Sequence, residues 1–203
     1  MRGYYFITDP GLSAAGLKSD CQKAVAAGVR IIQYRNKEAA TLTLYDEALC
    51  IKNICMGTST RLIINDRIDI ALAVDADGVH IGQEDMPYHV ARSLLGKDKI
   101  IGVTVRTLEE AKAAQGLGAD YLGVSPIFTT ATKLDAGKPC GVEVLKAIRQ
   151  ACNVPIVAIG GIDLSNIGLV IKAGADMACA ISAIVTKPDV AAEILKFQKE
   201  FGL

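Results

Sequence analysis

Short apolar runs alternate strictly with longer segments of helical pattern along the whole chain. The apolar runs predict strands at Tyr4–Thr8, Val29–Tyr34, Arg61–Asn65, Gly78–Ile81, Ile100–Thr104, Tyr121–Val124, Pro155–Ile159 and Met177–Ile181. The segments after them predict helices at Leu12–Ala27, Leu42–Met56, Arg67–Val74, Pro87–Leu95, Leu108–Leu117, Gly141–Ala151, Leu164–Lys172 and Pro188–Phe201. Strand–helix alternation indicates a parallel sheet, and this many units favour closure, because a closed sheet has no unpaired edges. We therefore predict an α/β fold, a single-domain (β/α)8 TIM barrel over residues 1–203.

A weak internal repeat supports this prediction. Predicted helices end at Ala26-Ala27-Gly28-Val29, at Gly118-Ala119-Asp120-Tyr121 and at Gly174-Ala175-Asp176-Met177, with a looser copy at Val74–Gly78. In each close copy a glycine stands where a left-handed residue stops a helix, and a strand follows at once. These turns belong on the amino-terminal face of a barrel, away from chemistry.

Charge and length limit the classes of function. The 203 residues fit one domain, and 51% of them are apolar, so a large core can be buried. The 22 basic and 22 acidic residues give a net charge of zero. A balanced surface predicts no binding to nucleic acid or to an anionic membrane. Any phosphate ligand must then be held by a local cluster.

The cysteines and the amino-terminal segment indicate a cytoplasmic protein. None of the six cysteines forms a C-x-x-C pair, and the two histidines complete no zinc set with them. We predict buried free thiols, with Cys140 as the exception to watch because it follows a long loop. Residues 1–10 contain no long apolar segment, so no secretory signal is expected, and no apolar run is long enough to span a bilayer.

The second predicted strand runs into a polar segment at its carboxyl end. Gln33, Arg35 and Lys37 are two residues apart, so in extended chain they share one face. At the carboxyl end of a barrel strand that face can point into the mouth. Two cations there need an anionic partner. The alternative is a solvated strand end with incidental charges.

Two carboxylates follow the next two strands. Asp66 comes directly after the third strand, next to Asn65, and Asp85 follows the fourth. Both can reach one point, and a set of few oxygen ligands suits Mg²⁺, which keeps waters and shares diphosphate oxygens. The alternative is that both aspartates cap the helices that begin near Arg67 and Pro87.

The longest irregular stretch is Ser125–Cys140, between the sixth strand and the sixth helix. Loops of this length in compact domains are often functional lids. This one carries Thr130, Thr132 and Lys133, and a lysine is a mobile point charge suited to a departing phosphate. An ordinary exposed loop lysine is the alternative.

The last two strands predict a phosphate site. Gly160-Gly161 follows the seventh strand, and Ile181-Ser182 closes the eighth. Barrels commonly bind phosphate at these loops through backbone N–H groups and a helix N-terminus. His80 and His89 are interpreted as structural, and no residue order suggests a nucleophilic triad.

Taken in order, these segments resemble the thiamine-phosphate synthase family over essentially the whole chain. The resemblance is carried by Gln33-Tyr34-Arg35-Asn36-Lys37, Asn65-Asp66, Gly82-Gln83-Glu84-Asp85, Pro126-Ile127-Phe128-x-Thr130-x-Thr132-Lys133 and Ile159-Gly160-Gly161-Ile162. It implies two substrates, hydroxymethylpyrimidine diphosphate and a hydroxyethylthiazole phosphate, which are joined to give thiamine phosphate and diphosphate.

The resemblance also implies a role for each matching residue. Mg²⁺ would be held by Asp66 and Asp85. The thiazole phosphate would be held by Thr130, Thr132, Gly161, Ile181 and Ser182. The pyrimidine diphosphate would be bound by Gln33, Arg35, Asn36, Lys37, Asn65, Thr104 and Lys133. Of these, Arg35, Lys37, Thr104 and Lys133 are expected to be catalytic.

The implied mechanism is dissociative. Diphosphate leaves first, and the thiazole nitrogen captures a pyrimidine-stabilised cation, so no general base is assigned. Mg²⁺ and the cations would stabilise charge on the leaving group, and a loop that closes the mouth would exclude water. Two positions depart from the family pattern, which often has Ser at Thr104 and His at Arg106. Threonine at position 104 retains the hydroxyl group that serine would supply.

Three alternatives remain open. The related thiazole tautomerases tend to lack the metal aspartates and carry a catalytic His where this chain has Pro126. A different phosphate-binding isomerase or epimerase would need Gly160-Gly161 and Ser182 but not the aspartate pair. A non-catalytic regulator would bind thiazole phosphate without turnover. A homo-oligomer is also left open by the sequence.

Overall fold

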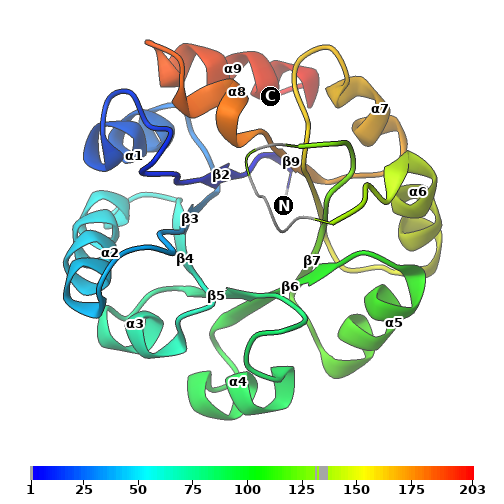
Figure 1. Cartoon of the computed structure of the whole chain (residues 1–203), viewed down its shortest axis with the longest axis horizontal. Helices are drawn as coiled ribbons and strands as arrows, with labels where there is room; N and C mark the ends of the chain where they lie inside the picture. Colours follow the sequence, from blue (N-terminus) through cyan, green and yellow to red (C-terminus); the bar gives the residue numbers. More distant parts are fainter. Residues whose placement is uncertain (1, 131, 133–136) are drawn as a thin grey trace.

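The computed structural model describes residues 2–130, 132 and 137–203. Its strands are β1 Gly3–Tyr4, β2 Phe6–Ile7, β3 Ile31–Tyr34, β4 Arg61–Asn65, β5 Gly78–Ile81, β6 Ile100–Val105, β7 Tyr121–Val124, β8 Ile156–Ile159 and β9 Met177–Cys179. Its helices are α1 Leu17–Ala26, α2 Thr41–Cys55, α3 Ile68–Ala73, α4 Tyr88–Leu95, α5 Leu108–Leu117, α6 Gly141–Ala151, α7 Ile167–Lys172, α8 Ile181–Val185 and α9 Val190–Glu200. The helices form a ring around the strands (Figure 1).

The sheet closes through its first strand. β1 and β2 are consecutive parts of one extended segment, and every strand pairing in the sheet is parallel. β1 pairs with β9 and β2 pairs with β3, and between them the Tyr5 N–H donates to the Ala178 carbonyl at 2.9 Å. The two ends of the sheet are therefore joined, and the prediction of a (β/α)8 barrel is confirmed.

Two helices begin later than predicted because local turns precede them. Before α1, the N–H groups of Leu12 and Ser13 donate to the Asp9 carbonyl, and Gly16 has φ 84, which no helix can accommodate. Before α7, the Asp163 carboxylate accepts from the Ser165 N–H at 2.8 Å, which makes a turn. Side-chain hydrogen bonds of this kind compete with the helix at its amino end.

The predicted strand Met177–Ile181 is wrong at its end. β9 stops at Cys179, and Ile181 begins the short helix α8, which the sequence did not predict. The β-branched residues of α8 favour a strand by local propensity, but Ile184 and Val185 are fully buried by packing. Tertiary burial therefore overrides the local preference here.

The core has two layers. The larger one lies between strands and helices. The smaller one fills the barrel interior and consists of Tyr5, Ile7, Ile31, Ile63, Tyr121, Val157, Met177 and Cys179. Because apolar and aromatic side chains fill the lower barrel, a ligand would bind at its mouth.

The repeated turns are structural, as predicted. Asp77, Asp120 and Asp176 each accept a hydrogen bond from a backbone N–H at the start of the neighbouring strand, at 2.8 Å in all three cases. Gly118 and Gly174 have φ 96 and 101, the left-handed conformation expected at a helix end. Each aspartate thus ties one strand to the next at the amino-terminal face.

All six cysteines are free thiols, and four of them are buried. Cys140 is half-buried, and burial raises the pKa of its thiol, so it has no character of an activated nucleophile. Over residues 2–130, 132 and 137–203, no helix is long and apolar enough to cross a membrane.

Candidate active site

A cavity of about 400 Å³ opens at the carboxyl ends of the barrel strands. The predicted site residues that line it are Gln33, Arg35, Lys37, Asn65, Asp66, Asp85, Thr104, Thr130, Thr132, Gly161, Ile181 and Ser182. These residues come from strand ends and loops all around the barrel, so the structure brings distant parts of the chain to one cavity.

One wall of the cavity carries positive charge. Gln33 is the third residue of β3, and Arg35 and Lys37 follow it at every second position, so all three side chains reach the cavity. Asn36 was also predicted to bind the diphosphate, but it lies between these residues and its side chain points away from the cavity. Its amide donates to the Glu47 carboxylate at 3.0 Å, and it does not line the cavity. Strand alternation explains this division.

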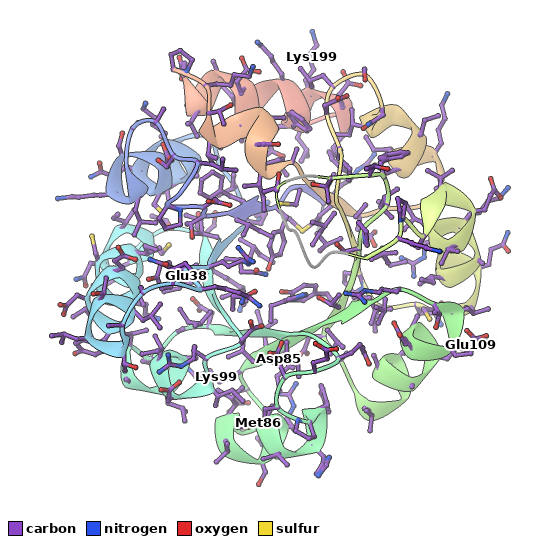
Figure 2. All side chains as sticks on the ribbon, in the orientation of Figure 1. Glu38, Asp85, Met86, Lys99, Glu109 and Lys199 are labelled. Carbon is purple, nitrogen blue, oxygen red and sulfur yellow. The ribbon has the colours of Figure 1, made fainter. Side chains whose placement is uncertain are left out.

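The two predicted metal aspartates meet at the same wall. Asp66 and Asp85 lie close enough to interact, and the Lys37 Nζ lies 3.3 Å from an Asp66 carboxylate oxygen. Burial, followed by the interaction with Asp85 and its negative charge, raises the pKa of Asp66 to about 6, against a lowering effect of Lys37. Asp85 lies between α4 and the barrel centre (Figure 2). This pair therefore carries more negative charge than its surroundings neutralise.

The alternative that these aspartates cap helices is wrong. The residues that precede α3 and α4 are Arg67 and Pro87, and neither helix has a side-chain cap. The Asp85 carboxylate instead accepts from the Gly82 N–H at 2.7 Å, within its own loop. Asp66 has φ 60, a left-handed conformation that is uncommon for residues other than glycine. Aspartate is one of the few residues that tolerate it. Both carboxylates are thus directed by the loops toward the cavity.

The carboxylate pair fits a magnesium ion better than a metal held entirely by protein. Among the described residues, no group of three or more His, Cys, Asp or Glu forms a metal cluster. Mg²⁺ commonly takes one or two carboxylates and completes its coordination with water and substrate phosphate. Two mutually repelling carboxylates are the donor set that such an ion would need.

The raised pKa of Asp66 predicts a pH-dependent stability of the metal-free protein. Because the native carboxyl binds its proton more tightly than the unfolded one, the native state is favoured at low pH and loses this advantage as pH rises from about 4 to about 6. The loss is on the order of 2 kcal/mol. Asp66→Asn should lack this decline, and urea denaturation at pH 4.5 and 7 in EDTA measures it. Equal pH profiles for both proteins would contradict the prediction.

The opposite wall has a different character, with backbone groups and hydroxyls. Gly160 and Gly161 follow β8 with φ 100 and 64, and both line the cavity beside Ser182. A Cβ on Gly161 would lie 2.4 Å from the Thr129 carbonyl oxygen, so only glycine allows the backbone this close. Together with the short helix α8, this wall has the composition of the phosphate site common in barrels.

Part of the long loop packs on this glycine pair. The N–H of Ile127 donates to the Ile159 carbonyl at 2.9 Å, and that of Phe128 donates to the Gly160 carbonyl at 3.0 Å. Thr130 and Thr132 line the cavity beyond this contact. The predicted catalytic Lys133 lies outside the described residues.

Sequence reasoning missed several residues at the cavity, including His80, Gln83 and Arg106. His80 pairs in register with Asn65, so the two side chains belong to the same layer facing the barrel interior. This pairing with a predicted site residue is the signal that could have identified His80. Gln83 donates to the Thr104 carbonyl at 2.6 Å. Arg106 lines the cavity near Gly137.

A closed (β/α)8 barrel with cations, a carboxylate pair and a glycine-rich wall around one cavity belongs to the phosphate-handling barrel enzymes. The family model described as thiamine monophosphate synthase matches residues 4–184. The chain therefore belongs to the thiamine-phosphate synthase family, as its motifs predicted, and is a transferase.

Individual relatives agree with this assignment. The chain is 53% identical over 194 residues to the thiamine-phosphate synthase of Methanosarcina barkeri, covering 96% of this chain and 88% of that protein. It is 46% identical to the thiamine-phosphate synthase of Syntrophomonas wolfei, covering 96% and 94%. Among solved structures, thiamine phosphate pyrophosphorylase from Pyrococcus furiosus superposes with a TM-score of 0.90 at 37% identity, covering 98% and 95%.

Proposed function

We propose that this chain transfers the hydroxymethylpyrimidine group from its diphosphate to hydroxyethylthiazole phosphate, giving thiamine phosphate and diphosphate, with Mg²⁺ as cofactor. The observation that carries the proposal is the division of one cavity into a wall with Arg35, Lys37, Asp66 and Asp85 and a facing wall with Gly160-Gly161. The first wall suits a diphosphate with its metal, and the second suits a monophosphate. One domain over residues 1–203 would perform the reaction.

The first wall would assist departure of diphosphate. Asp66 and Asp85 would hold Mg²⁺, which when bound supplies positive charge to the leaving group. Arg35, Lys37 and Asn65 would bind diphosphate oxygens. Guanidinium, ammonium and amide donors would stabilise the charge that grows as the carbon–oxygen bond breaks and its electron pair leaves with diphosphate. Lys133 is proposed to join them.

The second wall would place the acceptor. Thr130, Thr132, Gly161, Ile181 and Ser182 would bind the thiazole phosphate, while Thr104 and Gln33 would contact the pyrimidine from the cavity floor. The thiazole nitrogen then uses its lone pair to form the new carbon–nitrogen bond, and no proton has to be removed. Orientation of both partners and exclusion of water by the Ser125–Cys140 loop would supply much of the acceleration.

Incubation with both substrates tests the proposal. Purified protein with hydroxymethylpyrimidine diphosphate, hydroxyethylthiazole phosphate and Mg²⁺ should yield thiamine phosphate and one equivalent of diphosphate, detected by chromatography. EDTA should abolish turnover, and Mg²⁺ should restore it. Turnover of a single phosphorylated substrate without metal would instead support an isomerase, and binding of thiazole phosphate without product would support a regulator.

A further inference from the structure

A continuous chain of hydrogen-bonded side chains crosses the barrel at the floor of the cavity. The Gln33 Nε2 donates to the Tyr5 hydroxyl at 2.8 Å, and the Tyr5 and Tyr121 hydroxyls lie 2.7 Å apart. The Tyr121 hydroxyl lies 2.9 Å from the Nδ1 of His80, and the Nε2 of His80 lies 2.8 Å from the Thr104 hydroxyl. The chain, here called the floor relay, consists of Gln33, Tyr5, Tyr121, His80 and Thr104. Gln33, His80 and Thr104 line the cavity, and Gln33 and Thr104 are the two ends of the relay.

Two glycines in the strands leave space for the aromatic rings of the floor relay. A Cβ on Gly102 would lie 2.0 Å from the Cζ of Tyr121, and a Cβ on Gly123 would lie 2.9 Å from the Cε1 of His80. Two strand-interior glycines thus leave the space that these rings occupy, although glycine weakens a strand. The His80 and Tyr121 rings are also stacked, with centroids 5.4 Å apart. This space requirement is independent of the hydrogen bonds and points to the same residues.

Pairing each buried proton of the floor relay selects one direction of donation. Tyr5 and Tyr121 are fully buried, and burial is the main cause that raises the pKa of each phenol, so each keeps one proton. Tyr5 accepts from Gln33, so its own buried proton is paired when it donates to Tyr121. In that direction Tyr121 donates to the Nδ1 of His80, and a neutral imidazole carries its proton on Nε2, facing Thr104. The Thr104 hydroxyl then accepts from the Nε2–H of His80. Its own proton can therefore donate to a ligand in the cavity.

We infer that Tyr5, Tyr121 and His80 are positioning residues that set which cavity-floor atoms donate and which accept. Thr104 presents a donor hydroxyl, and Gln33, whose Nε2 is committed to Tyr5, presents its carbonyl oxygen as an acceptor. A pyrimidine with a ring nitrogen next to an exocyclic amine matches this pattern, since the ring nitrogen accepts and the amine donates. The oxo analogue has the reversed pattern. The inference rests on the proposed function for its substrate, but the relay itself does not.

The tautomer of His80 tests the relay without any substrate. The chain has two histidines, and His89 is exposed, so a His89→Gln background leaves His80 as the single imidazole. Its ¹⁵N shifts at neutral pH should report the Nε2–H tautomer. Tyr121→Phe removes the donor to Nδ1, so the population of the Nε2–H form should fall. Tyr4→Phe is the matched control, because the Tyr4 hydroxyl is equally buried but donates to the Ala180 carbonyl, outside the relay.

Discrimination between substrates tests the consequence. With the amino pyrimidine diphosphate, Tyr121→Phe should lower kcat/KM by about 10-fold to 100-fold, and the preference for the amino over the oxo analogue should fall at least about 10-fold. Tyr4→Phe should keep the wild-type preference. Tyr5→Phe should also reduce the preference, yet leave the His80 tautomer unchanged.

The results separate the relay from the proposed function. A wild-type His80 in the Nδ1–H or charged form would overturn the inference, as would an unchanged preference in Tyr121→Phe. Failure of Tyr121→Phe to fold leaves the wild-type tautomer and Tyr5→Phe as deciding measurements. If wild-type protein forms no thiamine phosphate while His80 is the Nε2–H tautomer, the proposed function fails and the relay stands.

Discussion

Asp85→Asn is expected to lower kcat/KM for thiamine phosphate formation on the order of 10³-fold, about 4 kcal/mol of transition-state stabilisation. The asparagine oxygen can still accept from the Gly82 N–H, so the loop should keep its shape. What is lost is one of the two charges proposed to hold Mg²⁺. Steady-state kinetics over a range of Mg²⁺ concentrations measures the effect.

The same substitution should make the metal-free protein more stable at pH 7. Asp85 contributes to the raised pKa of Asp66, so removing its charge relieves a repulsion that the native state now bears. Asp69→Asn is a matched control, because Asp69 is exposed and forms an ion pair with Arg67 that is worth less than about 1 kcal/mol. Near-wild-type turnover of Asp85→Asn would remove the metal assignment, whatever its stability.

Gly161→Ala is expected to destabilise the barrel by about 2–4 kcal/mol and to raise KM for thiazole phosphate about 10-fold or more. Two effects add at this position. The backbone has φ 64, which is unfavourable for any residue with a Cβ, and that Cβ would lie 2.4 Å from the backbone oxygen of Thr129. The loop must shift away, and the phosphate wall shifts with it. Urea denaturation and steady-state kinetics measure the two losses separately.

Gly168→Ala provides the control for this substitution. Gly168 lies in α7, where an added Cβ would meet no atom within 4 Å. Alanine is the better helix former by up to about 1 kcal/mol, so this variant should be slightly more stable than wild type and equally active. If Gly161→Ala behaved like Gly168→Ala, the close packing of the loop on the glycine pair would not matter for binding.

The fold was predictable because two independent signals agreed. The alternation of apolar runs with helical patterns predicts parallel strands, and the repeated Gly-Ala-Asp turns mark where a helix ends and the next strand begins. Helix α8 escaped prediction because Ile181 and its neighbours prefer strand locally, and only their burial makes the helix stable. Burial of this kind depends on the whole fold and leaves no local pattern.

The site was predictable where geometry follows from strand periodicity alone. Gln33, Arg35 and Lys37 reach the cavity because alternate residues of a strand share a face. The orientation of Asn36 toward Glu47 follows from the same rule applied to the residue between them. Whether Asp66 and Asp85 cap the following helices depended on loop geometry, which the sequence leaves open. The floor relay depends on register between five strands, so reading one strand at a time could not find it.

The first strand segment pairs with β9 through β1 and with β3 through β2. This arrangement has a consequence for biosynthesis. Residues 3–7 are synthesised long before β9, which spans residues 177–179. Until then the nascent sheet keeps two open edges, each able to pair with another chain. Closure links segments more than 170 residues apart, so it belongs to the slow, late class of folding events.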